Sequence, residues 1–139
     1  MTATMRINRI DHFNIRTRDL DRLCEFYTQV IGLEIGDRPP FDSPGVWLYA
    51  GGHPILHVGI AKDGGQHGKA DNTLPLDHIA LETEGFVDTL ARLDGAGIEY
   101  RMFDVPDREM KQIFVRDPDG VALELNFTNP EDLAAAARL

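Results

Sequence analysis

The chain has 139 residues, 42% hydrophobic and 27% charged, which is typical of one ordinary globular domain. Its formal net charge of −9 at pH 7 argues against nucleic acid and anionic membrane surfaces as partners, because both are negatively charged. No apolar run is long enough to span a bilayer, residues 1–9 lack the apolar stretch of a secretory signal, and the single Cys24 excludes an intramolecular disulfide. We therefore expect a cytoplasmic protein with one hydrophobic core.

The first half of the chain predicts one helix and four strands. Residues 10–15 alternate apolar and polar side chains, as a half-buried strand does. Asp19 is a suitable N-cap for the helix that follows, and Gly32 is a suitable residue to end it. Apolar residues at helical spacing lie between them: Leu20, Leu23, Tyr27, Val30 and Ile31. Further strands are expected at 33–38, 45–50 and 54–60. The pair Gly51 and Gly52 would turn the last two strands into a hairpin.

The second half of the chain predicts the same order of elements. An alternating segment over 76–82 precedes a helix that Gly95 and Gly97 would end. The apolar residues of this helix are Phe86, Leu90 and Leu93. Strands are expected at 98–103, 111–116 and 121–127. The sequence Asp117-Pro118-Asp119-Gly120 is typical of a turn between the last two strands.

The two halves are also related in sequence, at an offset of about 66 residues. The clearest repeat is Asp11-His12, which returns as Asp77-His78. We therefore predict an α+β fold of two tandem β-α-β-β-β modules within a single domain over 1–139. Module 1 spans about 7–60, a Gly-rich polar linker about 61–73, and module 2 about 74–127. A C-terminal extension over 128–139 contains a short alanine-rich helix from Pro130.

Four polar residues lie on one predicted face of the strands, opposite the apolar face that the helices would cover. They occupy the first and last strand of each half: His12, His57, His78 and Glu124. Gathering three imidazoles and a carboxylate without a partner is costly, and a divalent ion such as Fe(II), Mn, Ni, Co or Zn would remove that cost. We predict a metal site in which His57 and Glu124 also serve catalysis. The residues leave open whether His57 is a fourth ligand or an acid/base.

Other residues have less specific interpretations. Trp47 and Tyr49 share a strand face, where they would wall a substrate cavity, fill the core or contact a second chain. His53 and His67 lie in Gly-rich loops and are expected at the surface. Three basic residues surround the 104–110 loop and would either steer an anionic substrate or remain solvated: Arg101, Arg108 and Lys111.

At its predicted ligands the sequence resembles the vicinal-oxygen-chelate superfamily of glyoxalases, fosfomycin-resistance enzymes, extradiol dioxygenases and bleomycin-binding proteins. The resemblance runs from about Ile7 to Phe127. Its most specific pieces are Ile10-Asp11-His12, Phe26-Tyr27 with Ile31-Gly32-Leu33, Leu76-Asp77-His78-Ile79-Ala80, and Arg116-Asp117-Pro118-Asp119-Gly120 with Glu124-Leu125. It implies an open, cup-shaped mixed sheet with helices on its outer face, around a metal held by His12, His78 and Glu124 with His57 at the fourth position. It also implies a homodimer, since members usually pair and some share metal sites between chains.

The resemblance leaves several activities open. Glyoxalase-like isomerases carry a carboxylate where this chain has His57, and fosfomycin enzymes carry basic residues after the last ligand, which 126–132 lack. Bleomycin-binding proteins need no metal ligands. Extradiol dioxygenases match the ligand set and the further histidine, although larger members have four modules and a tyrosine near the position of Phe114.

We therefore favour dioxygenase-like ring cleavage of a catechol-like small molecule chelated through vicinal oxygens. A glyoxalase-type lyase or isomerase, and a non-catalytic drug- or metabolite-binding protein, are the alternatives. The substrate, the metal, and module pairing within a chain or across a dimer stay open.

Overall fold

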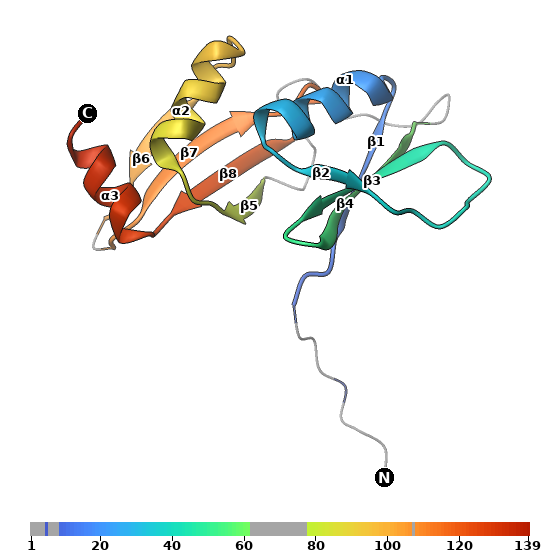
Figure 1. Cartoon of the computed structure of the whole chain (residues 1–139), viewed down its shortest axis with the longest axis horizontal. Helices are drawn as coiled ribbons and strands as arrows, with labels where there is room; N and C mark the ends of the chain where they lie inside the picture. The colour runs from blue at the N-terminus through green and yellow to red at the C-terminus, as the bar shows by residue number, and fades with distance from the viewer. Residues whose placement is uncertain (1–4, 6–8, 62–77, 107) are drawn as a thin grey trace.

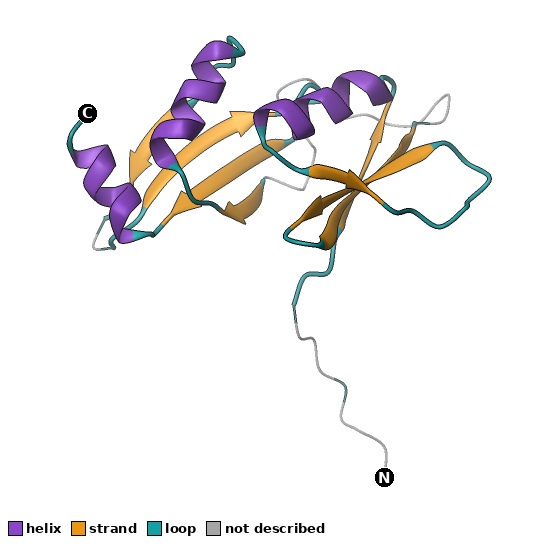
Figure 2. Ribbon diagram, in the orientation of Figure 1, coloured by secondary structure: helices purple, strands orange, loops and turns teal. Residues whose placement is uncertain are grey.

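The computed structural model describes residues 5, 9–61, 78–106 and 108–139 (Figure 1). The predicted linker from residue 62 onward, His67 and the start of the strand predicted at 76–82 lie outside these residues. Module 1 contains β1 (Phe13–Thr17), α1 (Leu20–Glu25), the π-helical turn η1 (Phe26–Val30), β2 (Glu34–Gly36), β3 (Gly45–Ala50) and β4 (His53–Ile60). Module 2 contains β5 (Ile79–Glu82), α2 (Phe86–Gly95), β6 (Arg101–Asp104), β7 (Lys111–Arg116) and β8 (Ala122–Phe127), and α3 (Pro130–Ala137) follows (Figure 2).

Each module forms a four-stranded mixed sheet with the same topology. The strand orders are β1-β4-β3-β2 and β5-β8-β7-β6. In each sheet the first strand runs parallel to the last, and the other pairs are antiparallel. The predicted α+β fold of two tandem modules is therefore confirmed. Within the described parts of the chain the two sheets are not hydrogen-bonded to one another, so β1 and β5 each form a free edge.

The helices cover one face of each sheet, as the alternating pattern predicts. Buried strand residues include Ile15, Leu48, Leu56, Val58, Ile113, Val115, Leu123, Leu125 and Phe127. They pack with residues from the helices: Leu23, Phe26, Tyr27, Phe86 and Leu93. Helices α1 and α2 lie on the same side of the molecule (Figure 1). No described helix covers the opposite face of either sheet, which we call the open face.

The first helix differs from the regular α-helix that its apolar spacing predicts. It begins as expected, with the Asp19 side chain accepting a hydrogen bond from the Arg22 amide at 3.0 Å. It ends as expected at Gly32, whose φ is +90°. From Phe26 onward, however, it is a π-helix. The Thr28 hydroxyl donates to the Cys24 carbonyl at 2.8 Å, a side-chain contact that competes with regular backbone bonding near this change.

A buried hydrogen bond connects the two modules. The Tyr27 hydroxyl in η1 donates to Asp117 Oδ2 at 2.7 Å, in the turn between β7 and β8. Asp117 Oδ1 accepts from the amides of Asp119 and Val121, so the same carboxylate also closes the predicted turn. Burial raises the pKa of Asp117, while the bonds from Tyr27 and the two amides act in the opposite direction. This contact fixes the first helical segment against the second sheet.

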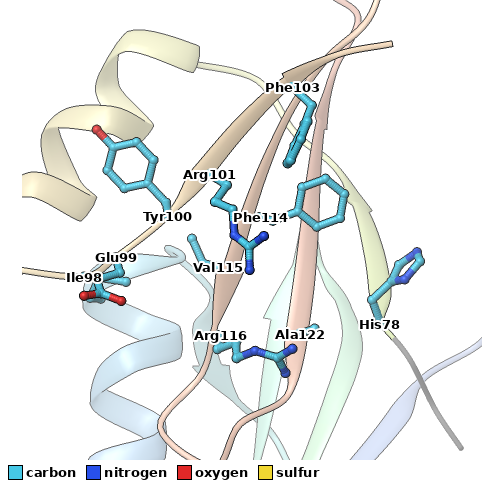
Figure 3. A pocket seen from close by; sticks show the side chains of 10 residues that line it. All are labelled: His78, Ile98, Glu99, Tyr100, Arg101, Phe103, Phe114, Val115, Arg116 and Ala122. Carbon is cyan, nitrogen blue, oxygen red and sulfur yellow. The ribbon is translucent and has the colours of Figure 1, made fainter. Parts of the chain in front are cut away.

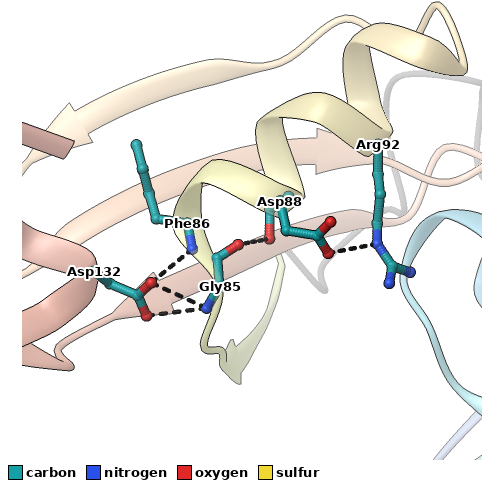
Figure 4. A network of polar contacts seen from close by, with 6 residues as sticks. Gly85, Phe86, Asp88, Arg92 and Asp132 are labelled. Atoms are coloured by element: carbon teal, nitrogen blue, oxygen red, sulfur yellow. Dashed lines mark hydrogen bonds and ion pairs between the residues drawn. The ribbon is translucent and has the colours of Figure 1, made fainter. Parts of the chain in front are cut away.

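The C-terminal helix contributes to module 2. Helix α2 follows Gly85, whose φ of +86° and missing side chain leave the first amides of the helix without a local cap. The Asp132 carboxylate of α3 accepts from the Gly85 amide at 3.0 Å and from the Phe86 amide at 2.8 Å (Figure 4). Helix α3 thus caps α2.

No helix among the described residues is long and apolar enough to cross a membrane.

Candidate functional site

The open face of module 1 carries a stack of three aromatic rings. The His57 ring on β4 lies between those of His12 and Trp47, with centroid separations of 3.8 Å on both sides. The planes differ by 15° and 7°. His57 and Trp47 are direct cross-strand partners, and His12 immediately precedes β1 because that strand begins at Phe13 rather than at residue 10. Two of the four predicted site residues therefore lie together here.

The environment of His57 favours its neutral form. Burial lowers the pKa of His57, and the neighbouring His12 lowers it further, while a backbone hydrogen bond with Pro54 acts in the opposite direction. Its buried Nε2 has no hydrogen-bond partner in the described structure. A neutral imidazole with an unused ring nitrogen is the form that binds a metal or accepts a proton. The arrangement is compatible with both predicted roles of His57.

Asp11 orients the other histidine of this pair. Its Oδ2 lies 2.6 Å from His12 Nδ1, and the hydrogen bond to His12 is the main reason that the pKa of Asp11 is lowered. If His12 Nδ1 carries the proton, Nε2 is left with the lone pair that a metal ligand needs. His53 Nε2 lies 2.8 Å from the Asp11 carbonyl, so this histidine holds the segment before β1. Periodicity did not indicate Asp11 as part of the site.

The open face of module 2 carries the second pair. His78 immediately precedes β5 and Glu124 lies on β8, with Nε2 and Oε1 3.9 Å apart. The Glu124 carboxylate accepts from Gln112 Nε2 at 2.9 Å and from Asn126 Nδ2 at 3.0 Å. These two amides hold the carboxylate in one orientation. The sequence pattern did not indicate a role for either amide, although Asn126 shares the Glu124 face at a spacing of two.

A cavity of about 1020 Å³ lies beside His78, and its lining includes aromatic and basic side chains together with Glu99 (Figure 3). The rings of Phe103 and Phe114 meet edge to face with centroids 5.5 Å apart. Arg101 is the cross-strand partner of Phe114, which is the partner of Glu124, so all three lie on the same open face. Arg101 therefore lines the cavity while it remains exposed, and both predicted roles, steering an anionic substrate or staying solvated, stay open.

The described structure groups the four predicted residues as two separate pairs. Among the residues that it describes, no group of three or more His, Cys, Asp or Glu is placed to hold one metal ion. The imidazole and carboxylate donors of the pairs suit a divalent ion. Two ligands fall short of the three or more protein ligands that catalytic ions usually have. A common metal centre stays a prediction that requires the two open faces to meet.

Comparison with known proteins places this fold among relatives of several functions. The chain is 27% identical to "Glyoxylase I 4" of Arabidopsis thaliana, over 87% of this chain and 71% of that protein. It is 28% identical to lactoylglutathione lyase of Schizosaccharomyces pombe, over 89% of this chain and 49% of that protein. The chain thus spans about half the length of that lyase.

Solved structures share the fold at low sequence identity. The antibiotic-binding protein TnmS3 from Streptomyces sp. CB03234 matches with a TM-score of 0.67 and 19% identity, over 91% of this chain and 100% of that one. The fosfomycin resistance protein FosX from Listeria monocytogenes matches with a TM-score of 0.66 and 19% identity, over 92% of this chain and 99% of that one. The model of the Glyoxalase/Bleomycin resistance protein/Dioxygenase superfamily matches residues 9–125. The chain therefore belongs to this superfamily.

Proposed function

We propose that this chain is a divalent-metal-dependent enzyme that binds a small organic substrate through two neighbouring oxygens. The observation that carries the proposal is the presence of complementary half-sites, His12 with His57 and His78 with Glu124, on the two open faces. His12, His78 and Glu124 would hold the ion. His57 would be a fourth ligand or the proton-transfer residue.

A homodimer would bring the half-sites together. Strands β1 and β5 are sheet edges, and such edges have unpaired backbone groups that favour pairing with another strand. His12 and His78 stand immediately before these strands. Placing β1 of one protomer beside β5 of its partner would continue both sheets and bring the two histidines toward one another. Two-fold symmetry would then form two equivalent sites.

The chain's own residues supply orientation and proton transfer. A bound divalent ion would act as a Lewis acid toward the two substrate oxygens. Gln112 and Asn126 hold the Glu124 carboxylate by hydrogen bonds at 2.9 and 3.0 Å. His57, neutral and held by its stacked neighbours, would accept a proton from a substrate hydroxyl.

The walls of the half-sites favour an aromatic substrate, and we propose oxygen-dependent ring cleavage as its reaction. Trp47 and Phe41 lie in the cavity of module 1, and Phe103 and Phe114 lie in that of module 2. Flat aromatic walls suit a dihydroxylated ring. The second candidate is a lyase or isomerase reaction, which the names of the two curated relatives favour. In that reaction His57 would occupy the place of the carboxylate base.

The experiment combines metal analysis with oxygen consumption. Glu124→Gln should lose most of its bound metal, because a neutral amide is a much weaker ligand than a carboxylate. Glu25→Gln, on the exposed side of α1, is the matched control and should retain it. With Fe(II) and catechol, the wild-type protein should consume oxygen and yield a ring-opened product.

The outcomes separate the candidates. Full metal retention in Glu124→Gln would overturn the metal site. Turnover of an α-hydroxycarbonyl compound under nitrogen, without oxygen uptake on catechol, would favour the lyase or isomerase. Stoichiometric ligand binding that survives a chelator and yields no product would instead indicate a binding protein.

A further inference from the structure

Two arginines of module 1 lie over a facing pair of glycines. Gly45 on β3 and Gly59 on β4 are direct cross-strand partners. A Cβ built on Gly45 would lie 2.8 Å from Arg38 Nη2, and one built on Gly59 would lie 3.4 Å from Arg16 Nη1. Directly opposed positions in an antiparallel pair are about 5 Å apart, and both arginines line the one cavity over this pair of glycines. The absence of side chains at both glycines leaves room for them over the open face.

The described lining of the cavity around this pair carries a net positive charge. The surrounding cavity, of about 640 Å³, is lined by both arginines and by no Asp or Glu among the described residues. The chain as a whole has 23 acidic against 14 basic residues, so this lining is opposite in charge to the protein. Arg38 donates to the Ser43 carbonyl at 2.9 Å, which satisfies one of its N–H groups without neutralising it. Two cations in one cavity that no described carboxylate lines favour binding of an anion.

The same cavity contains aromatic surface. Trp47 lines it, with His57 stacked on one side and the Phe41 ring centroid 6.5 Å away. Arg38 lies over the Phe41 ring, 5.0 Å from its centroid. A ligand that contacts Trp47 thus has a cationic pair within the same hollow. Carboxylate and aromatic ring are the two features that this surface would recognise together.

We infer that Arg16 and Arg38 form a carboxylate-binding subsite, which makes the substrate class an aromatic acid whose ring lies against Trp47. The inference rests on the proposed function, because it places this acid in the cavity that contains His57. The carboxylate would bind the two guanidinium groups, and neighbouring oxygens elsewhere on the ring would remain available to the predicted metal ligands.

The test measures ligand binding by the fluorescence of Trp47, the chain's only tryptophan. The probes are 3,4-dihydroxybenzoate, which has both a carboxylate and vicinal hydroxyls, and catechol, which lacks the carboxylate. The wild-type protein should bind 3,4-dihydroxybenzoate about tenfold more tightly, a typical gain for a charge-assisted pair. Arg16→Gln and Arg38→Gln should each remove most of this preference. Arg138→Gln, at the exposed C-terminus, is the control and should keep it.

Separate readings distinguish this subsite from the metal centre. Equal affinity for the two probes in the wild-type protein, or an unchanged preference in both arginine variants, would overturn the inference. Competition by inorganic phosphate as effective as that by benzoate would overturn its aromatic part. If 3,4-dihydroxybenzoate is preferred in metal-free protein and Glu124→Gln retains full metal content, the subsite stands and the proposed metal site fails.

Discussion

Tyr27 and Asp117 show at the scale of single residues how the two modules are held together. Both are buried, with exposed fractions of 0% and 5%, so the carboxylate depends on its protein donors. Burial raises the pKa of Asp117 above its ordinary value of 3.8. The folded state therefore loses stability as the pH rises from 3.8 and this buried carboxyl group becomes charged. The Tyr27 hydroxyl reduces this cost by bonding to the charged form.

Tyr27→Phe should therefore lower the free energy of unfolding at pH 7 by about 1.5–3 kcal/mol, because it removes a donor to a buried charge. Losing this donor raises the pKa of Asp117 further. The loss of unfolding free energy in Tyr27→Phe should therefore become smaller as the pH falls and the carboxylate is protonated. Denaturant unfolding at several pH values measures this. Tyr100→Phe removes an exposed bond to Asp94 and should cost at most about 0.5 kcal/mol. Equal losses in the two variants would contradict the prediction.

The site residues that the sequence predicted are those that follow from the period-two pattern of single strands. His57 and Glu124 were predicted because each alternates with apolar residues along its strand. Gln112 was not found, because its contact with Glu124 depends on the register between β7 and β8. Arg38 was missed for a similar reason, since its place over Gly45 depends on the path of a loop. Side-chain contacts between strands depend on how the strands pair and in which register. The pattern of a single segment does not predict this.

At the scale of elements, the cap of α2 comes from another helix. The predicted strands at 45–50 and 111–116 have the observed bounds, and Asp19 caps α1 from the adjacent sequence. Helix α2 begins after Gly85, which offers no side chain, and Asp132 lies 46 positions beyond Phe86. Local propensity therefore predicted that α3 would form but gave no indication of what it contacts.

Asp132→Ala should lower the free energy of unfolding by about 0.5–2 kcal/mol, the usual cost of removing a helix N-cap. Thermal or denaturant unfolding provides the measurement. Glu131→Ala changes the adjacent carboxylate of the same helix, which is exposed, and serves as the matched control. A loss in Glu131→Ala as large as that in Asp132→Ala would show that helix charge, rather than the bonds to Gly85 and Phe86, is responsible.

At the scale of the whole molecule, the repeat predicted the two modules but not how their open faces relate. That relation depends on contacts such as Tyr27 with Asp117, which join residues 90 positions apart. The sequence could therefore assign four residues to equivalent faces without showing that one chain divides them into two pairs. A shared site in a dimer would join the pairs again.

Mixing two defective variants tests that arrangement. His12→Ala and Glu124→Gln should each bind little metal alone. In a heterodimer of the two, one site has both defects and the other has none, so random exchange should restore about a quarter of the wild-type metal content. Metal analysis after joint refolding measures this, with each variant refolded alone as the control. No recovery in a mixture shown to contain heterodimers would contradict a site shared between chains.

The division of the proposed site between the two open faces has a consequence for regulation. If the site forms only in the dimer, a single protomer would be folded but inactive, because its two pairs of ligands lie on separate faces. Turnover per chain would then depend on the fraction of the protein that is dimeric. The concentration of the protein in the cell would control its activity without any change in fold.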